Sequence, residues 1–299
     1  MVRGSGSLAG VAAGASERLP ILRNVRRLPD HTSRLLVAAD AKDGLGGAVP
    51  SPAAAFLLAL ITLPSLFWLV TLKRTTEYTV PEEWLMTNLV PQVHAWVQST
   101  APPLDSLLIG ISGLGSGWFV GAGFGVLGLL ALAKGRRDLA LVLAAGTLAF
   151  PIEWALKYFT AIPPITPAQL FNALFDVNGI GLDDLADFPA GHALRATAFY
   201  GLAAFCVARL APDRRQGLTA YGVAVLLIGA ISMTRIYLEA HYPMDVLGGW
   251  MAGAALVSII VAVHVLGVDE RIRAEEALAL ASAARPRRVA VSLRRRGEP

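Results

Sequence analysis

The sequence is poor in charged residues. Only 16% of its 299 residues are Asp, Glu, Lys or Arg, whereas 55% are hydrophobic. A soluble domain has about 25% charged residues, so the composition excludes an ordinary soluble protein. Apolar stretches of about 20 residues, the length that crosses a bilayer as a helix, recur between short polar breaks. The composition therefore indicates an integral membrane protein.

Cysteine is almost absent as well. Cys206 is the single cysteine and lies in an apolar run, which excludes an internal disulfide and a thiolate metal cluster. The sequence also lacks a basic stripe interleaved with aromatic residues, because the arginines behind its net charge of +4 lie in the tails and in short loops. We therefore expect no nucleic-acid partner, and membrane orientation explains the arginines better.

The apolar runs predict an all-α integral membrane bundle of six transmembrane helices. The expected spans cover about 53–72, 107–133, 139–157, 190–210, 218–235 and 245–267. Residues 51–267 would form the membrane domain. A flexible basic tail over 1–50 and a basic tail over 268–299 would flank it. A cleaved transit peptide is the alternative for the first tail, which is rich in Arg and Ser.

Basic residues are distributed unevenly between the two sides of this arrangement. Both tails and the clusters "KGRR" (134–137) and "PDRR" (212–215) share one side, which the positive-inside rule makes cytoplasmic. We expect a protein of the cell (inner) membrane with both termini in the cytoplasm. Lys73 and Arg74 are exceptions on the opposite side, which would face the periplasm or exterior.

Three polar clusters fall together on that outer side. They are Lys157 at the end of the third span, Gly191 and His192 at the start of the fourth, and Arg235, His241 and Asp245 around the loop before the sixth. Taken alone, each has a structural explanation, such as a lysine that reaches toward headgroups. Together, two histidines, two cations and a helix N-terminus favour a site for an anion. Glu153 also shares a helix face with Lys157.

These residue types can process a phosphate ester without a metal. Asp245 follows His241 by four residues, so its carboxylate can accept a hydrogen bond from one imidazole nitrogen and leave the other as nucleophile or base. One imidazole would attack phosphorus while the other protonates the leaving oxygen, and Lys and Arg would hold the remaining oxygens. Zinc is disfavoured because two cations would crowd it. We expect no metal and no cofactor.

The clusters resemble the motifs of the type 2 phosphatidic acid phosphatase family, which are a Lys followed by Arg-Pro, then Pro-Ser-Gly-His, then Ser-Arg-x5-His-x3-Asp. The segment "TRIYLEAHYPMD" (234–245) reproduces the Arg, His and Asp spacing of the third motif. The segment "PAGH" (189–192) matches the second, except that Ala190 replaces Ser. Lys157 matches the first, but Pro164 stands where the Arg is expected. An important phosphate ligand is therefore missing.

The resemblance implies a metal-independent phosphatase that hydrolyses a lipid phosphate or polyprenyl (di)phosphate at the outer membrane face through a phosphohistidine. It makes His241 the nucleophile, Asp245 the residue that orients it, and His192 the general acid. The implied phosphate ligands are Lys157, Gly191 through its backbone N–H, and Arg235. Arg195 lies three residues after His192, on nearly the same helix face, and is our candidate for the missing positive charge.

Three alternatives remain open to different degrees. A phosphohistidine can pass its phosphoryl group to an alcohol as readily as to water, so the protein could be a phosphotransferase. The incomplete motifs also suit a catalytically impaired membrane protein that binds lipid phosphates. Ser112 and His264 resemble a rhomboid protease pair, but they would lie roughly 20–25 Å apart in depth, which disfavours that class. The expected partners are a lipid phosphate substrate and membrane lipids.

Overall fold

All regular secondary structure in the described residues is helical. The computed structural model describes residues 48–75, 79–161, 164, 166, 168–169 and 186–284, all within one compact unit, Gly47–Pro299. No strand occurs in these ranges, so the predicted all-α fold class is confirmed. The expected N-terminal tail lies almost entirely outside the described residues. The last 15 residues of the C-terminal tail also lie outside them, as do most of residues 158–188, which connect the third expected span to the fourth.

The long helices have the length and apolar composition that a bilayer requires. In the described ranges five qualify as spans: α3 (Pro52–Thr75), α8 (Arg137–Gly146) continued by α9 (Ala149–Thr160), α11 (Gly191–Leu210), α12 (Arg214–Tyr237), and the Pro243–Val268 part of α13 (Pro243–Ala284). A further span is formed by α6 (Pro102–Gly113) and α7 (Gly117–Ala133), which meet at a bend of 54°. Counting this bent pair as one span gives the predicted six.

The bend between α6 and α7 differs from the single helix expected over 107–133. It falls in a glycine-rich stretch, and glycine is a poor helix former. The Leu114 carbonyl accepts a hydrogen bond from the Tyr200 hydroxyl at 3.1 Å. The Gly115 carbonyl accepts one from Arg195 Nε at 3.4 Å. Because carbonyl groups that leave a helix ladder need new partners, these side chains of α11 stabilise the bend.

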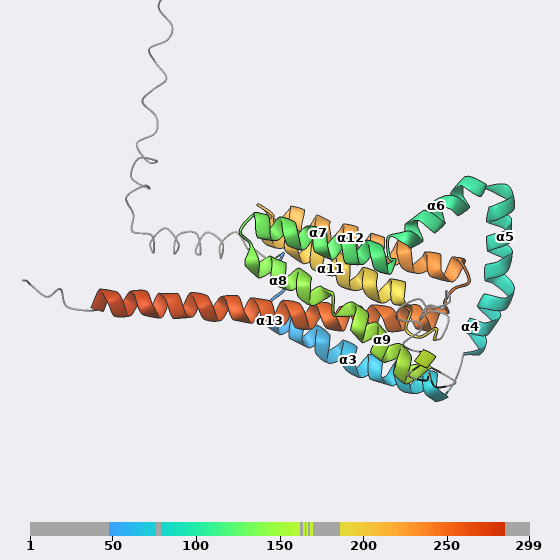
Figure 1. The fold of residues 1–299 in the computed structure, drawn as a ribbon, viewed down its shortest axis with the longest axis horizontal. Helices are drawn as coiled ribbons and strands as arrows, with labels where there is room; N and C mark the ends of the chain where they lie inside the picture. The colour runs from blue at the N-terminus through green and yellow to red at the C-terminus, as the bar shows by residue number, and fades with distance from the viewer. Residues whose placement is uncertain are drawn as a thin grey trace, which may run out of the picture. The chain divides into compact units, whose positions relative to one another are not determined.

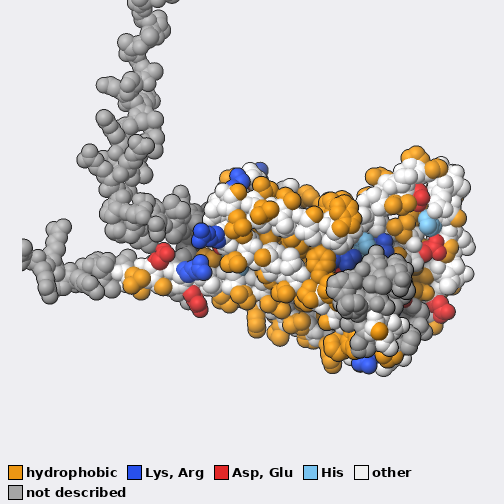
Figure 2. All heavy atoms as spheres, in the orientation of Figure 1, with side chains coloured by type: hydrophobic (Ala, Val, Ile, Leu, Met, Phe, Trp, Pro, Cys, Tyr) orange, Lys and Arg blue, Asp and Glu red, His pale blue; other side chains and the backbone are white. Residues whose placement is uncertain are grey.

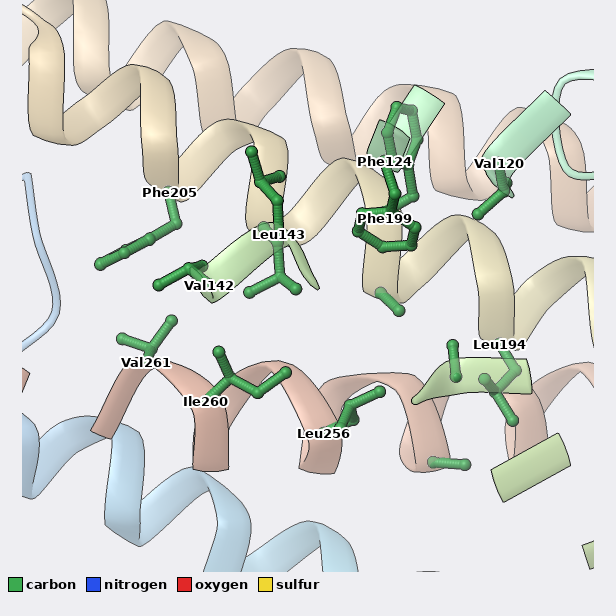
Figure 3. Close-up of a cluster of buried hydrophobic side chains, with 14 of the residues drawn as sticks. Val120, Phe124, Val142, Leu143, Leu194, Phe199, Phe205, Leu256, Ile260 and Val261 are labelled. Atoms are coloured by element: carbon green, nitrogen blue, oxygen red, sulfur yellow. The ribbon is translucent and has the colours of Figure 1, made fainter. Parts of the chain in front are cut away.

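Apolar side chains of α7, α8, α11 and α13 fill the centre of the bundle (Figure 3). Phe124 and Phe199 meet edge to face with ring centroids 5.1 Å apart, an arrangement that aromatic pairs prefer. Gly123 lets the helices approach here, since a Cβ on it would come within 2.5 Å of the Phe199 ring. This packing fixes the relative positions of the helices whose ends carry the polar clusters.

The segment between the first two spans consists of α4 (Val80–Trp84), the π-helical η1 (Leu85–Leu89) and α5 (Val90–Thr100). In Figure 1, α5 runs across one end of the bundle rather than along it. Figure 2 shows apolar side chains over the flank of the bundle and charged side chains at its two ends. Phe67 and Trp68 on α3 are among the exposed apolar residues, as expected for a surface in contact with lipid.

Candidate active site

The polar clusters meet at the end of the bundle near α4 and α5 (Figures 1 and 2). Lys157 Nζ donates a hydrogen bond at 2.6 Å to the carbonyl of Ala186, in the segment that leads into α11. The Ala190 N–H donates at 2.9 Å to the backbone carbonyl of Asp245 in α13. Hydrogen bonds therefore tie the end of α9, the start of α11 and the start of α13 together.

Lys157 is fully buried, with 0% of its side chain exposed. This burial excludes a lysine that reaches toward headgroups, the structural explanation for a lysine at the end of a span. A buried ammonium must be hydrogen-bonded or paired, because its desolvation is costly. The structure thus places a cation inside the site, next to the segment that precedes His192. Its predicted contact with phosphate stays a prediction.

The helix α11 begins at Gly191, within one residue of the expected start of the fourth span at about 190. Ala190 is the N-cap residue and no side chain caps the helix. Its first-turn N–H groups therefore lack the side-chain cap that a Ser at position 190 can provide. A Cβ on Gly191 would overlap Glu153 Oε1 and lie 2.9 Å from Arg195 Nη1. The close approach of these side chains explains why glycine occupies this position.

The substitution Gly191→Ala should therefore lower both stability and turnover. Overpacking typically costs about 1–3 kcal/mol, and here the displaced groups adjoin His192. The measurement is the unfolding temperature in detergent together with phosphate release. Gly110→Ala is the matched control, because nothing lies within 4 Å of a Cβ at that helical glycine. Equal behaviour of the two variants would contradict the packing explanation.

A buried ion pair lies directly behind His192. Arg195 Nη1 donates to Glu153 Oε2 at 2.5 Å, and the two side chains are 10% and 1% exposed. Arg195 Nη2 lies 3.4 Å from His192 Nδ1. Because a guanidinium can only donate, Nδ1 is the acceptor in this contact, and neutral His192 carries its proton on Nε2. The pair thus orients the histidine ring.

Arg195 lies beside His192, as the helical spacing predicted. Its guanidinium is nevertheless engaged by the protein itself, through the Glu153 carboxylate and the Gly115 carbonyl. The charge of Glu153 offsets that of Arg195, so Arg195 brings less net positive charge to the site than its sequence position suggested. A direct bond between Arg195 and phosphate stays a prediction.

The loop between α12 and α13 holds His241 beside Arg235. The Arg235 carbonyl accepts the N–H groups of Ala240 at 3.0 Å and His241 at 3.3 Å. Arg235 Nη1 donates to Ser112 Oγ at the end of α6 at 3.1 Å. His241 is buried, whereas His192 and Arg235 are partly exposed. The accessible edge of the site therefore runs along His192 and Arg235.

Asp245 is fully buried in the first turn of α13. Its Oδ1 lies 2.9 Å from Lys73 Nζ, and its Oδ2 accepts the Tyr242 N–H at 2.9 Å. Each carboxylate oxygen has two lone pairs, so these contacts leave acceptor capacity for an imidazole N–H. The predicted bond from His241 to Asp245 stays a prediction.

Two buried charged residues of this site, Lys73 and Glu82, were not predicted as site residues from the sequence. Glu82 Oε1 accepts the Met244 N–H at 2.7 Å and so caps the start of α13. A signal for Glu82 was present, because Thr79 and Glu82 have the spacing of a capping box, and Glu82 Oε2 accepts the Thr79 N–H at 3.2 Å. For Lys73 the signal was its position on the outer side, where the positive-inside rule predicts few lysine and arginine residues.

A second polar cluster ties α5 and α6 to the loop that carries His241. His94 Nδ1 lies 3.0 Å from Glu239 Oε1, and the Tyr237 hydroxyl donates to Asp105 Oδ1 at 2.8 Å. Glu239 has a φ of 58°, in the left-handed region that non-glycine residues rarely adopt. The contact with His94 helps to hold this backbone conformation two residues before His241.

The structure also bears on two other kinds of site, a metal centre and a rhomboid-like serine–histidine pair. Within the ranges given above, no three His, Cys, Asp or Glu residues are grouped so that they could hold a metal ion. Ser112, one half of the rhomboid-like pair, bonds to Arg235. His264, the other half, packs edge to face on Phe205 with ring centroids 5.5 Å apart, further along α11. The two residues therefore lie in different surroundings.

The helices and the polar cluster define an all-α membrane protein with two histidines, several cations and a helix N-terminus at one end of its bundle. Residues 141–267 match the family model described as PAP2 superfamily, which confirms the resemblance seen in the sequence. The matched range contains all three motif segments and excludes α3 through α7.

A comparison with curated proteins finds a similar bacterial enzyme. The chain is 30% identical over 90 residues to Phosphatidylglycerophosphatase B of Bacillus subtilis (strain 168). This match covers 29% of the chain and 40% of that relative. No solved structure matches the chain significantly.

Proposed function

We propose that this protein is a membrane phosphatase that hydrolyses a lipid phosphate or a polyprenyl (di)phosphate without a metal. The match of residues 141–267 to the PAP2 superfamily model and the similarity to a phosphatidylglycerophosphatase support a phosphatase of lipid substrates. The observation that carries the proposal is the assembly of the three motif segments at one end of the bundle, with hydrogen bonds from Lys157 to Ala186 and from Ala190 to Asp245.

In the proposed first step, a nitrogen of His241 attacks phosphorus. An N–P bond forms, the P–O bond to the lipid breaks, and His192 gives a proton to the departing oxygen. An anionic phosphate beside His192 favours its imidazolium, the form that donates this proton. Protonation of His192 at Nδ1 would break its weak 3.4 Å contact with Arg195. Asp245 would orient His241 and stabilise the positive charge that its ring gains.

In the second step, water attacks the phosphohistidine. His192, now neutral, accepts a proton from this water, the N–P bond breaks, and inorganic phosphate leaves. Lys157, Arg235 and the Gly191 N–H would hold the nonbridging oxygens in both steps. Hydrogen bonds to charged groups contribute about 1.5–3 kcal/mol each, so these contacts account for much of the stabilisation of the transition state.

The proposed orientation places the site at the periplasm or exterior and both termini in the cytoplasm of the cell (inner) membrane. In the sequence, Lys73 is an exception to this orientation, because it places a positive charge on the outer side. In the structure it is 8% exposed and pairs with Asp245, so it belongs to the interior of the protein. The positive-inside rule counts loop charges near the ends of the spans, and a buried, paired lysine is not one of them.

The test is phosphate release by purified full-length protein in detergent, with EDTA present. The panel contains phosphatidylglycerol phosphate, phosphatidic acid and a polyprenyl diphosphate. We expect release that survives EDTA and is lost in His241→Ala. Release that EDTA abolishes and a divalent metal restores would contradict the metal-independent mechanism.

Two structural observations favour a second candidate, an impaired protein that binds lipid phosphates. Ala190 provides no side-chain cap at the start of α11, and Glu153 offsets the charge of Arg195. Binding of these lipids without turnover of any of them would support this candidate. Transfer of the phosphoryl group to an added alcohol, without free phosphate, would identify a phosphotransferase.

A further inference from the structure

We propose that Lys73 is a positioning residue that holds Asp245 in place for catalysis by His241. The inference rests on the proposed function. Lys73 lies in α3, outside the range that matches the superfamily model, yet its Nζ is 2.9 Å from Oδ1 of Asp245 in the third motif. A helix that the family motifs do not include therefore supplies a charged contact to the site.

The burial of both partners gives this contact its importance. The side chains of Lys73 and Asp245 are 8% and 0% exposed. A carboxylate removed from water stays ionised only when a cation and hydrogen-bond donors replace its hydration. Lys73 supplies the cation and the Tyr242 N–H donates to the other oxygen. Both contacts favour the ionised form of Asp245 against the cost of its burial, and this is the form that best accepts a hydrogen bond from an imidazole.

The helix geometry explains why a lysine at this position meets the aspartate. Lys73 lies in the last turn of α3 and Asp245 in the first turn of α13, and the two helices pack against each other. A cation near a helix C-terminus and an anion near a helix N-terminus are both favourable. Glu82, which caps Met244, places a further carboxylate at the same end of α13. The start of α13 is therefore fixed by side chains from two elements outside the family motifs.

Two other roles for Lys73 make different predictions. As a direct phosphate ligand it would compensate for the Arg missing at Pro164, and its loss would weaken substrate binding. As a purely structural partner it would affect stability alone. Its Nζ is on the Asp245 carboxylate, so we expect its effect to pass through Asp245 and to appear in kcat.

The experiment compares Lys73→Met, Lys73→Arg, Asp245→Asn and the double variant Lys73→Met/Asp245→Asn in the full-length protein. Arg74→Met is the matched control, because Arg74 is the neighbouring cation and is exposed. The measurements are kcat and KM for short-chain phosphatidic acid, or for whichever lipid of the panel is hydrolysed fastest, and inhibition by inorganic phosphate. Unfolding temperature and gel-filtration profile report on folding.

We expect Lys73→Met to lower kcat by about 10- to 100-fold, the effect of one lost hydrogen bond between charged groups. KM and phosphate inhibition should change by no more than about threefold. Lys73→Arg should keep more activity than Lys73→Met, since it retains the charge. Most informative is the double variant, which should be no slower than Asp245→Asn, because two residues that act as a unit have non-additive effects. Arg74→Met should behave as the wild type.

Several results would overturn the inference. An increase in KM and loss of phosphate inhibition, with kcat retained, would make Lys73 a phosphate ligand. Multiplicative losses in the double variant would show that Lys73 and Asp245 act independently. If Lys73→Met does not fold, the double variant decides, because it removes both charges of the pair; full turnover by a folded double variant would refute the positioning role. A wild type inactive on every lipid would remove the proposed function itself, and the catalytic role of Lys73 with it.

Discussion

Replacing His241 with alanine is expected to reduce phosphate release by at least about 10⁴-fold, the scale of effect seen when a catalytic nucleophile is removed. Alanine has no atom that can form a bond to phosphorus, and the buried position of His241 leaves little room for water to take over its role. The measurement is single-turnover phosphate release with the lipid that the wild type hydrolyses fastest. Residual activity near the wild-type level would rule out His241 as the nucleophile.

The same variant tests the proposed intermediate directly. A phosphohistidine contains an N–P bond, so brief reaction with a phosphate-labelled lipid should leave label on the wild type that acid removes and base does not. His241→Ala should carry no such label. His264→Ala is the matched control, since it removes a histidine of α13 that packs on Phe205 of α11 rather than in the site. It should retain the label and turnover within about threefold.

Breaking the buried pair between Glu153 and Arg195 is expected to have the largest effect on stability. Arg195→Ala leaves Glu153, 1% exposed, without the guanidinium 2.5 Å from its oxygen. Removing one partner of a buried ion pair destabilises a protein by about 3–5 kcal/mol. The unfolding temperature in detergent measures the loss. An unfolding temperature equal to that of the wild type would contradict the importance of the pair.

A double variant that replaces both charged residues with apolar ones distinguishes the effect of this pair on stability from its effect on catalysis. Glu153→Leu combined with Arg195→Met removes both charges and keeps apolar volume, so it should recover much of the stability lost in Arg195→Ala. It also removes the contact of Arg195 with His192 Nδ1 and any positive charge that Arg195 gives to the phosphate. We expect this folded variant to turn over more slowly than the wild type. Wild-type turnover and KM would refute a role for Arg195 in phosphate binding.

Local sequence patterns predicted much of this fold. Composition and apolar runs predicted the helices that can cross a bilayer, because burial in lipid restricts a spanning segment to about 20 apolar residues regardless of its neighbours. The start of α11 was predicted to within one residue of Gly191. The spacing of Arg235, His241 and Asp245 carried the resemblance to the phosphatase family, and it could be found in the sequence because these residues are close in the chain.

Contacts between distant segments could not be predicted in the same way. Helical spacing placed Glu153 and Lys157 on one face, but the ion pair described here joins Glu153 to Arg195, 42 residues away. The bend between α6 and α7 depends on the hydroxyl of Tyr200 and the guanidinium of Arg195. Each of these contacts depends on how the helices pack, which single-sequence periodicity does not specify.

The sequence by itself determined that this chain is helical, that it has the composition of a membrane protein, and that it carries segments resembling the three PAP2 motifs, with departures at Pro164 and Ala190. Only the tertiary structure decided which charges meet inside the bundle. In the sequence, Lys73 is a cation on the outer side, where the positive-inside rule predicts few. In the structure it is the partner of Asp245. The physical reason is that a buried carboxylate must be compensated by whichever cation packing brings within reach, and packing joins α3 to α13 across most of the chain.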